Sequence, residues 1–186
     1  VFFNQEKSKA FAEALAEIED YEQLLNDAHD ALPVSEDEEV QKYNQVLLKN
    51  AEAYEHAVEN YLDYGGSKKI YELAQELTED VDAPYEKAKI LEMYFIENDY
   101  TYDLSYRKEM GEIVEDFLFD TKRGVCYEYA TAMTLLARAA GIPARYCEGF
   151  NMQTQYLDDK GNNFIVTAND AHGFPELYIK GYGWMC

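Results

Sequence analysis

The sequence predicts an α+β protein, with helices in the first two-thirds of the chain and antiparallel strands after them. Apolar residues recur every three or four positions before Lys122, whereas later segments alternate between apolar and polar residues. The chain has 186 residues, 47% of them apolar and 28% charged, which is the balance of a soluble globular protein. This length suffices for one domain with an extension or for two small domains.

Two long amphipathic helices are predicted at the start of the chain. The first begins near Ala10 and ends before Pro33, and Ser35 with Glu38 forms a capping-box pattern that opens the second. Gly65 and Gly66 end the second helix. Because the connection is short, we expect residues 1–65 to form an antiparallel hairpin, docked on the helical side of a second domain at residues 66–186.

The second domain is predicted to start with helices and to finish with strands. Pro84 suits the first turn of a helix, and Gly141 suits the residue that follows one. We predict helices at Ser67–Leu77, Pro84–Glu97, Gly111–Phe119 and Cys126–Ala140, extended chain at Tyr100–Tyr102, and strands at Pro143–Phe150, Asn163–Thr167 and His172–Ile179.

The charge of the chain excludes some classes of partner. Asp and Glu number 37 against 16 Lys and Arg, a net charge of -21, which repels nucleic acid phosphates and anionic lipid. The chain also has no apolar run of the length that a transmembrane helix needs. We therefore expect a protein or peptide substrate, no nucleic acid, no direct membrane binding, and any surface anchor to lie outside this sequence.

Cys126 is the first candidate for a chemical role. A cysteine in the first turn of a helix meets unpaired backbone N–H groups and the positive end of the helix dipole, which favour the reactive thiolate. His172 falls in a predicted strand, whereas the other two histidines fall among charged residues of the N-terminal helices. An imidazole near the sulfur would complete a nucleophilic pair. The alternatives are that Cys126 is a small buried hydrophobe, or that Cys126, Cys147 and His172 bind zinc, for which the spacing is wrong.

Several segments resemble the core of the transglutaminase-like superfamily, and the resemblance covers the chain from about residue 60 onward. The segments are Gly124-Val125-Cys126, Tyr129-Ala130, Leu135 to Arg145, Gly149-Phe150, Ala171-His172, Glu176 to Ile179 and Gly183-Trp184. The resemblance implies a papain-like α+β fold with a Cys-His-Asp triad. Cys126 would be the nucleophile and His172 the general base.

The sequence also departs from the family pattern. The third triad member would lie beyond Cys186, unless Asp170 or Glu176 substitutes for it. Phe174 stands where the family usually has tryptophan. Pro175 cannot donate a hydrogen bond to a neighbouring strand, so the strand must be bulged there or have an unpaired edge.

These features together predict thiol-dependent acyl transfer on a peptide or carboxamide, with no cofactor and no metal. The backbone N–H of Cys126 and a second donor would hold the oxyanion. The enzyme would be a protease, an amidase or a cross-linking transglutaminase, and hydrolysis is favoured because water needs no acceptor site. The alternatives are a non-catalytic binding or scaffold domain and a hairpin that binds a partner helix. A bacterial, extracellular or cell-surface location fits the charge.

Overall fold

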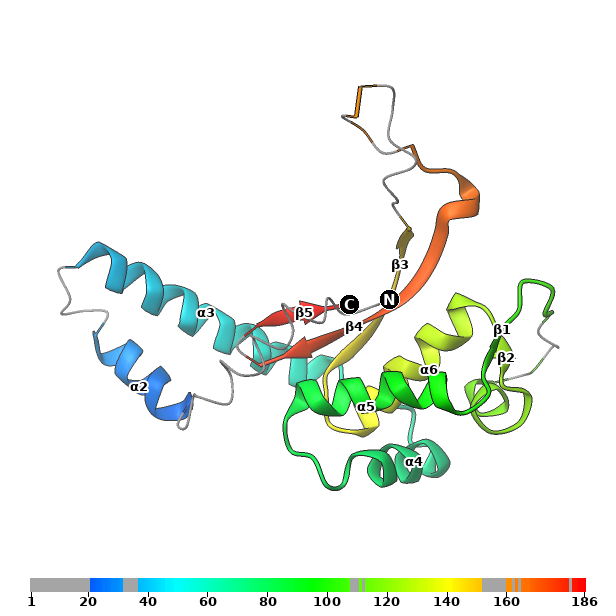
Figure 1. The fold of residues 1–186 in the computed structure, drawn as a ribbon. Helices are drawn as coiled ribbons and strands as arrows, with labels where there is room; N and C mark the ends of the chain where they lie inside the picture. The colour runs from blue at the N-terminus through cyan, green and yellow to red at the C-terminus, as the bar shows by residue number, and fades with distance from the viewer. Residues whose placement is uncertain are drawn as a thin grey trace.

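The computed structural model describes residues 21–31, 37–107, 111, 113–151, 160–161, 163, 165–180 and 182–186. It confirms the α+β class. Helices lie on both sides of a small antiparallel sheet, and the long strand β4 (Ala171–Ile179) runs through its middle (Figure 1).

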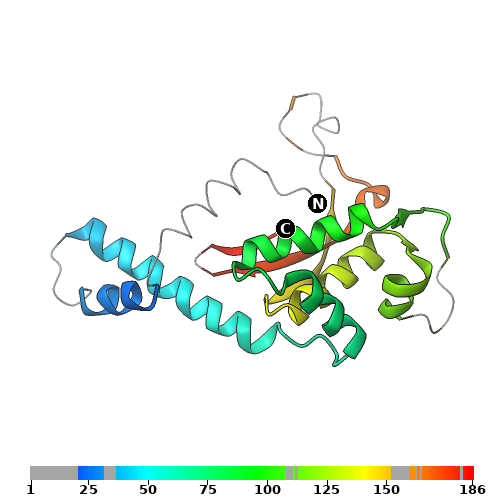
Figure 2. The ribbon, with the colours of Figure 1, turned by 60° about the horizontal axis from the view of Figure 1, so that its bottom comes forward.

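The N-terminal helices pack against each other and extend away from the rest of the molecule (Figure 2). They are α2 (Tyr21–Ala31) and α3 (Glu38–Asn60). Asp37 caps α3, because its carboxylate accepts hydrogen bonds from the backbone N–H groups of Glu39 (2.9 Å) and Val40 (3.4 Å). The helix cap therefore lies two residues beyond the expected Ser35, which itself falls outside the described residues, as do residues 10–20 of the first predicted helix.

The end of α3 packs against the sheet. The sequence had suggested instead that the hairpin docks on the helical side of the core. Tyr54 contacts the ring of Tyr178 on β4, and Tyr61 meets Trp184 edge to face with ring centres 5.0 Å apart. The backbone N–H of Ala144 also donates to the carbonyl of Tyr61 (3.0 Å). Adjacent residues of a strand point to opposite faces, so α3 covers the face of the sheet that carries Tyr178, while Leu177 faces the core.

The core lies between the other face of the sheet and the remaining helices. These are α4 (Lys68–Thr78), α5 (Pro84–Glu97), a π-helical segment, η1 (Asp116–Thr121), and α6 (Cys126–Ala139). Ser67 caps α4 through a bond from the backbone N–H of Ile70 (3.2 Å). The alanine-rich α6 is at the centre, and its buried face packs on α4, α5 and β4.

The main sheet has the order β3-β4-β5, with β3 at Ala144–Phe150 and β5 at Gly183–Met185. The register of β3 with β4 runs without a bulge from Ala144 opposite Leu177 to Phe150 opposite Ala171. Within the described residues, β5 pairs with β4 only from Leu177 onward, so Pro175 sits where β4 has an open edge. This confirms the second of the two alternatives predicted for that proline.

A second, two-stranded sheet joins β1 (Thr101–Tyr102) to β2 (Arg123–Gly124) in parallel. Two predicted elements differ from the structure. Residues 165–167 are not a strand, and a 3₁₀ turn, η3 (Ala168–Asp170), follows them; the helix predicted at 111–119 is instead the π-helical segment that begins at Asp116.

None of the helices in the described part of the chain has the length and apolar character that a bilayer-spanning segment requires.

Candidate active site

The N-terminus of α6 is built around a glycine and a glutamate. Val125 has extended backbone, and its N–H donates to the Oε2 atom of Glu128 (2.9 Å), which fixes the point where the helix begins. A Cβ atom on Gly124 would lie 2.7 Å from the Cβ of Glu128, so only glycine leaves room for this cap. Glu128 therefore has a structural role at the start of α6.

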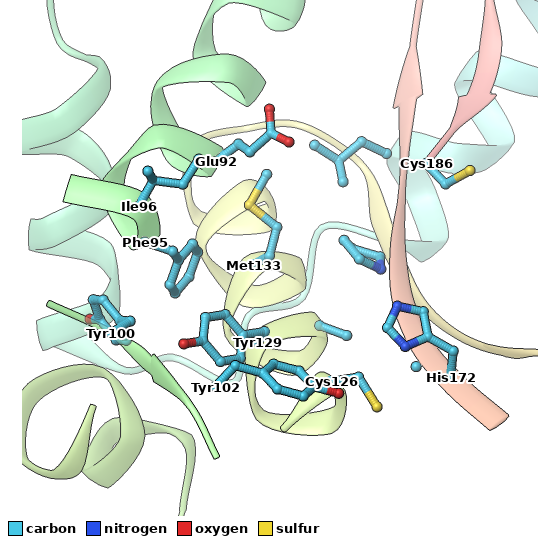
Figure 3. Close-up of a pocket in the computed structure, with 14 residues that line it drawn as sticks. Glu92, Phe95, Ile96, Tyr100, Tyr102, Cys126, Tyr129, Met133, His172 and Cys186 are labelled. Atoms are coloured by element: carbon cyan, nitrogen blue, oxygen red, sulfur yellow. The ribbon is translucent and has the colours of Figure 1, made fainter. Parts of the chain in front are cut away.

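Cys126, the first residue of α6, is buried with 7% of its surface exposed, and it lines a cavity of about 400 Å³. His172 from β4 lines the same cavity. The two side chains lie at the same end of the cavity, one projecting from α6 and the other from β4 (Figure 3). The structure thus brings together the two residues that the sequence singled out, although they are remote in the chain.

The rest of the cavity is mainly apolar and aromatic. It lies between α5, α6 and β4, and the ring of Phe95 contacts those of Tyr100 and Tyr129 along its wall. Its other lining residues are Glu92, Ile96, Tyr102, Ala130, Met133, Gly173, Pro175, Leu177 and Cys186. The cavity can therefore take an apolar group beside the thiol.

Tyr102 is the site residue that sequence reasoning missed. Its hydroxyl interacts with Cys126 through both the thiol and the backbone, and it points toward Cys126 (Figure 3). The pKa of Tyr102 lies above its usual value, first because the ring is partly withdrawn from water and then because a nearby thiolate disfavours a phenolate. The one signal in the sequence was the extended Tyr100–Tyr102 segment, which carried no indication of its partner strand.

His172 is partly buried, and this burial lowers the pKa of its imidazole below the usual 6.5 because the charged form loses hydration. The neighbouring residues set the local packing. His172 is opposite Gly149 on β3, and the ring of Phe174 approaches to 3.3 Å from where a Cβ on Gly149 would be. Phe174 thus packs on the backbone of β3 directly beside the histidine.

Neither proposed substitute for the triad acid faces His172. The carboxylate of Asp170 accepts hydrogen bonds from the backbone N–H (2.7 Å) and hydroxyl (2.9 Å) of Thr167. Glu176 accepts bonds from Arg145 Nε (2.7 Å) and the thiol of Cys147 (3.2 Å). In the described part of the chain, no carboxylate is hydrogen-bonded to the imidazole of His172.

Arg145 pairs with Glu176, and its guanidinium lies 4.1 Å from the centre of the Trp184 ring. Cys147 belongs to this polar cluster, because its thiol donates to Glu176. Burial raises the pKa of the Cys147 thiol, and the bond to Glu176 raises it further.

Two tyrosines lie over the backbone of Gly173, next to the histidine. A Cβ on Gly173 would lie 2.9 Å from the hydroxyl of Tyr146 and 3.2 Å from the ring of Tyr127. Tyr146 also donates to Glu148 (2.9 Å). Both rings are exposed, so they form an aromatic rim beside Cys126 and His172.

The fold is α+β, and its central helix begins with a cysteine. This helix packs on an antiparallel sheet that carries a histidine. Together these features define a class of thiol-containing domain. The model of the transglutaminase-like superfamily matches residues 71–186. The chain belongs to this superfamily.

Two curated proteins are similar in sequence. Protein YebA of Bacillus subtilis strain 168, described as uncharacterized, is 34% identical over 161 residues, which cover 82% of this chain and 21% of that protein. A protein-glutamine gamma-glutamyltransferase of Pseudomonas aeruginosa is 36% identical over 120 residues, 64% of this chain and 18% of that protein. The chain therefore spans about a fifth of the length of these relatives.

Solved structures show the same fold. The periplasmic domain of TgpA from Pseudomonas aeruginosa, bound to ethylmercury, has a TM-score of 0.61 and 32% identity, covering 70% of this chain and 47% of that one. A proposed cysteine protease from Cytophaga hutchinsonii has a TM-score of 0.50 and 26% identity, covering 66% of this chain and 37% of that one.

Proposed function

We propose that the protein transfers acyl groups from peptide or carboxamide substrates through a thioester on Cys126, with His172 as general base and acid. The observation that carries this proposal is that Cys126, at the N-terminus of α6, and His172, on β4, line one end of the same cavity. The similarity to a glutamyltransferase and to a proposed cysteine protease supports it.

The first chemical step uses groups from both elements. The imidazole of His172 takes the thiol proton, and the sulfur lone pair of Cys126 forms a bond to the substrate carbonyl carbon. The carbonyl π electrons move to the oxygen, which the backbone N–H of Cys126 can bind. When the double bond re-forms, the C–N bond breaks, and His172 gives its proton to the departing amine.

The thioester is then resolved by water, which makes the protein a protease or amidase, or by an amine, which makes it a cross-linking enzyme. Both outcomes share the acyl-enzyme, so one assay separates them. With a glutamine peptide as the substrate, formation of the thioester releases ammonia in both cases; water then yields glutamate, whereas added hydroxylamine yields a hydroxamate.

The test measures ammonia and hydroxamate release from N-carbobenzoxy-glutaminyl-glycine in the presence of hydroxylamine. We expect Cys126→Ala to abolish both products and His172→Gln to reduce them by roughly 10²-fold or more. Cys147→Ala is the matched control, since that thiol lies on the other face of the sheet. Equal product release by Cys126→Ala and the unaltered protein would refute the proposal.

A non-catalytic scaffold is the second candidate, and the observation that favours it is the absence of a carboxylate on His172 in the described residues. In that case the thiol of Cys126 would still be accessible from the cavity, but no thioester would form with any acyl donor.

We also propose an extracytoplasmic location, because the similar domain of TgpA is periplasmic. Fractionation of cells that produce the full natural protein, with protease added to intact cells or spheroplasts, tests this. Protection of the domain in spheroplasts would overturn it.

A further inference from the structure

We propose that the hydroxyl of Tyr102 is the second hydrogen-bond donor of the oxyanion hole, beside the backbone N–H of Cys126. This inference rests on the proposed function, because an oxyanion forms only if Cys126 attacks a carbonyl. It assigns a catalytic role to a residue on a strand that precedes α6 by some twenty positions in the sequence.

The pairing of β1 with β2 places Tyr102 next to the nucleophile. Tyr102 is opposite Gly124, two residues before Cys126. The backbone hydrogen bond from Asp103 N–H to the Gly124 carbonyl (2.9 Å) holds the end of β1 against β2. Arg123 forms an ion pair with the carboxylate of Asp103, which links the side chains of the same two strands. The backbone of Tyr102 is thus fixed relative to the start of α6.

The side chain of Tyr102 extends from β1 to the thiol and the backbone N–H of Cys126. Its hydroxyl hydrogen-bonds with the thiol of Cys126, and its oxygen accepts from the backbone N–H of Cys126, where the positive end of α6 lies. An oxyanion held by the N–H of Cys126 would therefore meet the phenol as well. Tyr100, two residues earlier, contributes no such group, because its hydroxyl donates to the carbonyl of Leu118 (2.6 Å).

The chemistry of Tyr102 suits a donor and not a base. Its raised pKa keeps the phenol protonated throughout the neutral range, so a proton is available for the developing negative charge. The ring of Tyr129, with its centre 5.9 Å from that of Tyr102, supports the side chain. A donor held in place before the reaction stabilises the transition state without reorganisation.

During the reaction, the Sγ lone pair forms the C–S bond and the carbonyl π electrons move to oxygen. The phenol O–H of Tyr102 and the N–H of Cys126 both donate to that oxygen. Neither proton is transferred. The negative charge returns to the C=O bond when the leaving group departs with its bonding electrons.

The experiment compares two reactions of the same thiol in the full chain. p-Nitrophenyl acetate acylates Cys126 through an oxyanion, whereas iodoacetamide alkylates it by displacing iodide from a saturated carbon, without one. Dividing the first rate constant by the second cancels any change in thiolate content or access. We expect Tyr102→Phe to lower this ratio by roughly 10²-fold, the effect of losing one oxyanion donor, while the ester concentration at half-saturation changes little.

Tyr71→Phe on α4 is the matched control, since it removes another exposed phenol, one that does not line the cavity, and its ratio should equal that of the unaltered protein. Circular dichroism checks that each variant is folded. An unchanged ratio in Tyr102→Phe would overturn the assignment, and a raised ratio would show that the phenol blocks the carbonyl site. If Cys126→Ala is acylated as fast as the unaltered protein, the proposed function fails instead.

Discussion

The thiols of the chain lie in three different chemical environments. Cys126 is at a helix N-terminus and lines the same cavity as His172, Cys147 donates to a carboxylate, and Cys186 is exposed. An ordinary thiol with a pKa near 8.5 is only about 1% thiolate at pH 6.5. This difference makes the thiols distinguishable at mildly acidic pH.

We expect iodoacetamide at about pH 6.5 to label Cys126 first and Cys147 last. The Glu176 carboxylate disfavours a thiolate at Cys147, since both would be negative. Peptide mapping by mass spectrometry after a short exposure measures the order. Labelling of Cys147 ahead of Cys126 would contradict the prediction, and labelling of both at the rate of Cys186 would show that α6 and His172 do not activate the thiol.

His172 gives a pH dependence whose sign follows from its burial. The imidazole acts as a base only when neutral, and its lowered pKa keeps it neutral to below pH 6.5. Acylation of Cys126 by p-nitrophenyl acetate should therefore fall on the acid side of pH 6.5, and His172→Gln should remove this decline. A rate that already halves above pH 7 in the unaltered protein would indicate a raised pKa.

The same shift contributes to folding stability in a defined direction. Because the folded state binds a proton less readily than the unfolded state, the contribution of His172 is complete above pH 6.5 and is lost as the pH falls below it.

At the scale of elements, the start of α6 depends on Glu128, whose carboxylate accepts the Val125 N–H. Glu128→Ala removes this cap, and we expect it to lower the free energy of unfolding by about 0.5 to 2 kcal/mol. Urea unfolding followed by circular dichroism measures the change. Glu86→Ala, in the first turn of α5, is a control that removes a similar charge without removing a capping bond.

The two N-terminal helices should differ in their importance to the core. A chain that begins at Asp37 lacks α2 but keeps the contacts of α3 with the sheet, and its thermal midpoint should stay close to that of the full chain. A chain that begins at Ser67 also loses the Tyr61–Trp184 and Tyr54–Tyr178 contacts and the bond from Arg138 to the Asp63 carbonyl.

These losses should cost about 3 kcal/mol or more. Thermal unfolding of both shortened chains tests this prediction. An unchanged midpoint after removal of α3 would show that residues 1–65 and 66–186 are separate domains, as the sequence alone had suggested.

Elements with strong local signals could be predicted from the sequence. Pro84 at the first turn gave the bounds of α5, and the cysteine and Gly141 bracketed α6 to within a residue. The pairing between distant segments could not be predicted, although the extended segments that form β1, β3 and β4 were. β1 and β2 have two residues each and exist only because they pair across the chain, so the position of Tyr102 was not visible in the sequence.

The strand predicted at residues 163–167 is wrong at 165–167 for the opposite reason: the local signal is strong, but a partner strand is lacking in the described part of the chain. Ile165 and Val166 favour extended backbone, but a strand also needs a partner, and in the described part of the chain they pair with none and are exposed. Cys126 and His172, which line one cavity, could be singled out from the sequence because a helix N-terminus and a lone histidine in a strand are local features. Tyr102, the proposed second oxyanion donor, could not be singled out in this way.

At the scale of the whole molecule, the net charge of -21 sets the response to salt. Like charges on a compact chain repel one another, and added ions screen this repulsion. We expect the thermal midpoint to rise as sodium chloride increases from about 0.05 M to about 0.5 M. Potassium glutamate and choline chloride distinguish general screening from binding of one ion, and a midpoint that falls with all three salts would contradict the prediction.

The assembly of the site from α6 and β4 also bears on how the protein is made. During synthesis the ribosome releases Cys126 well before His172, and β4 must be added to the sheet before the imidazole reaches the cavity that Cys126 lines. The nascent chain therefore carries an unactivated thiol in a partly folded state, where a reactive one would modify neighbouring proteins. Under the proposed function, the order of the chain delays reactivity until β4 has joined the sheet beside α6.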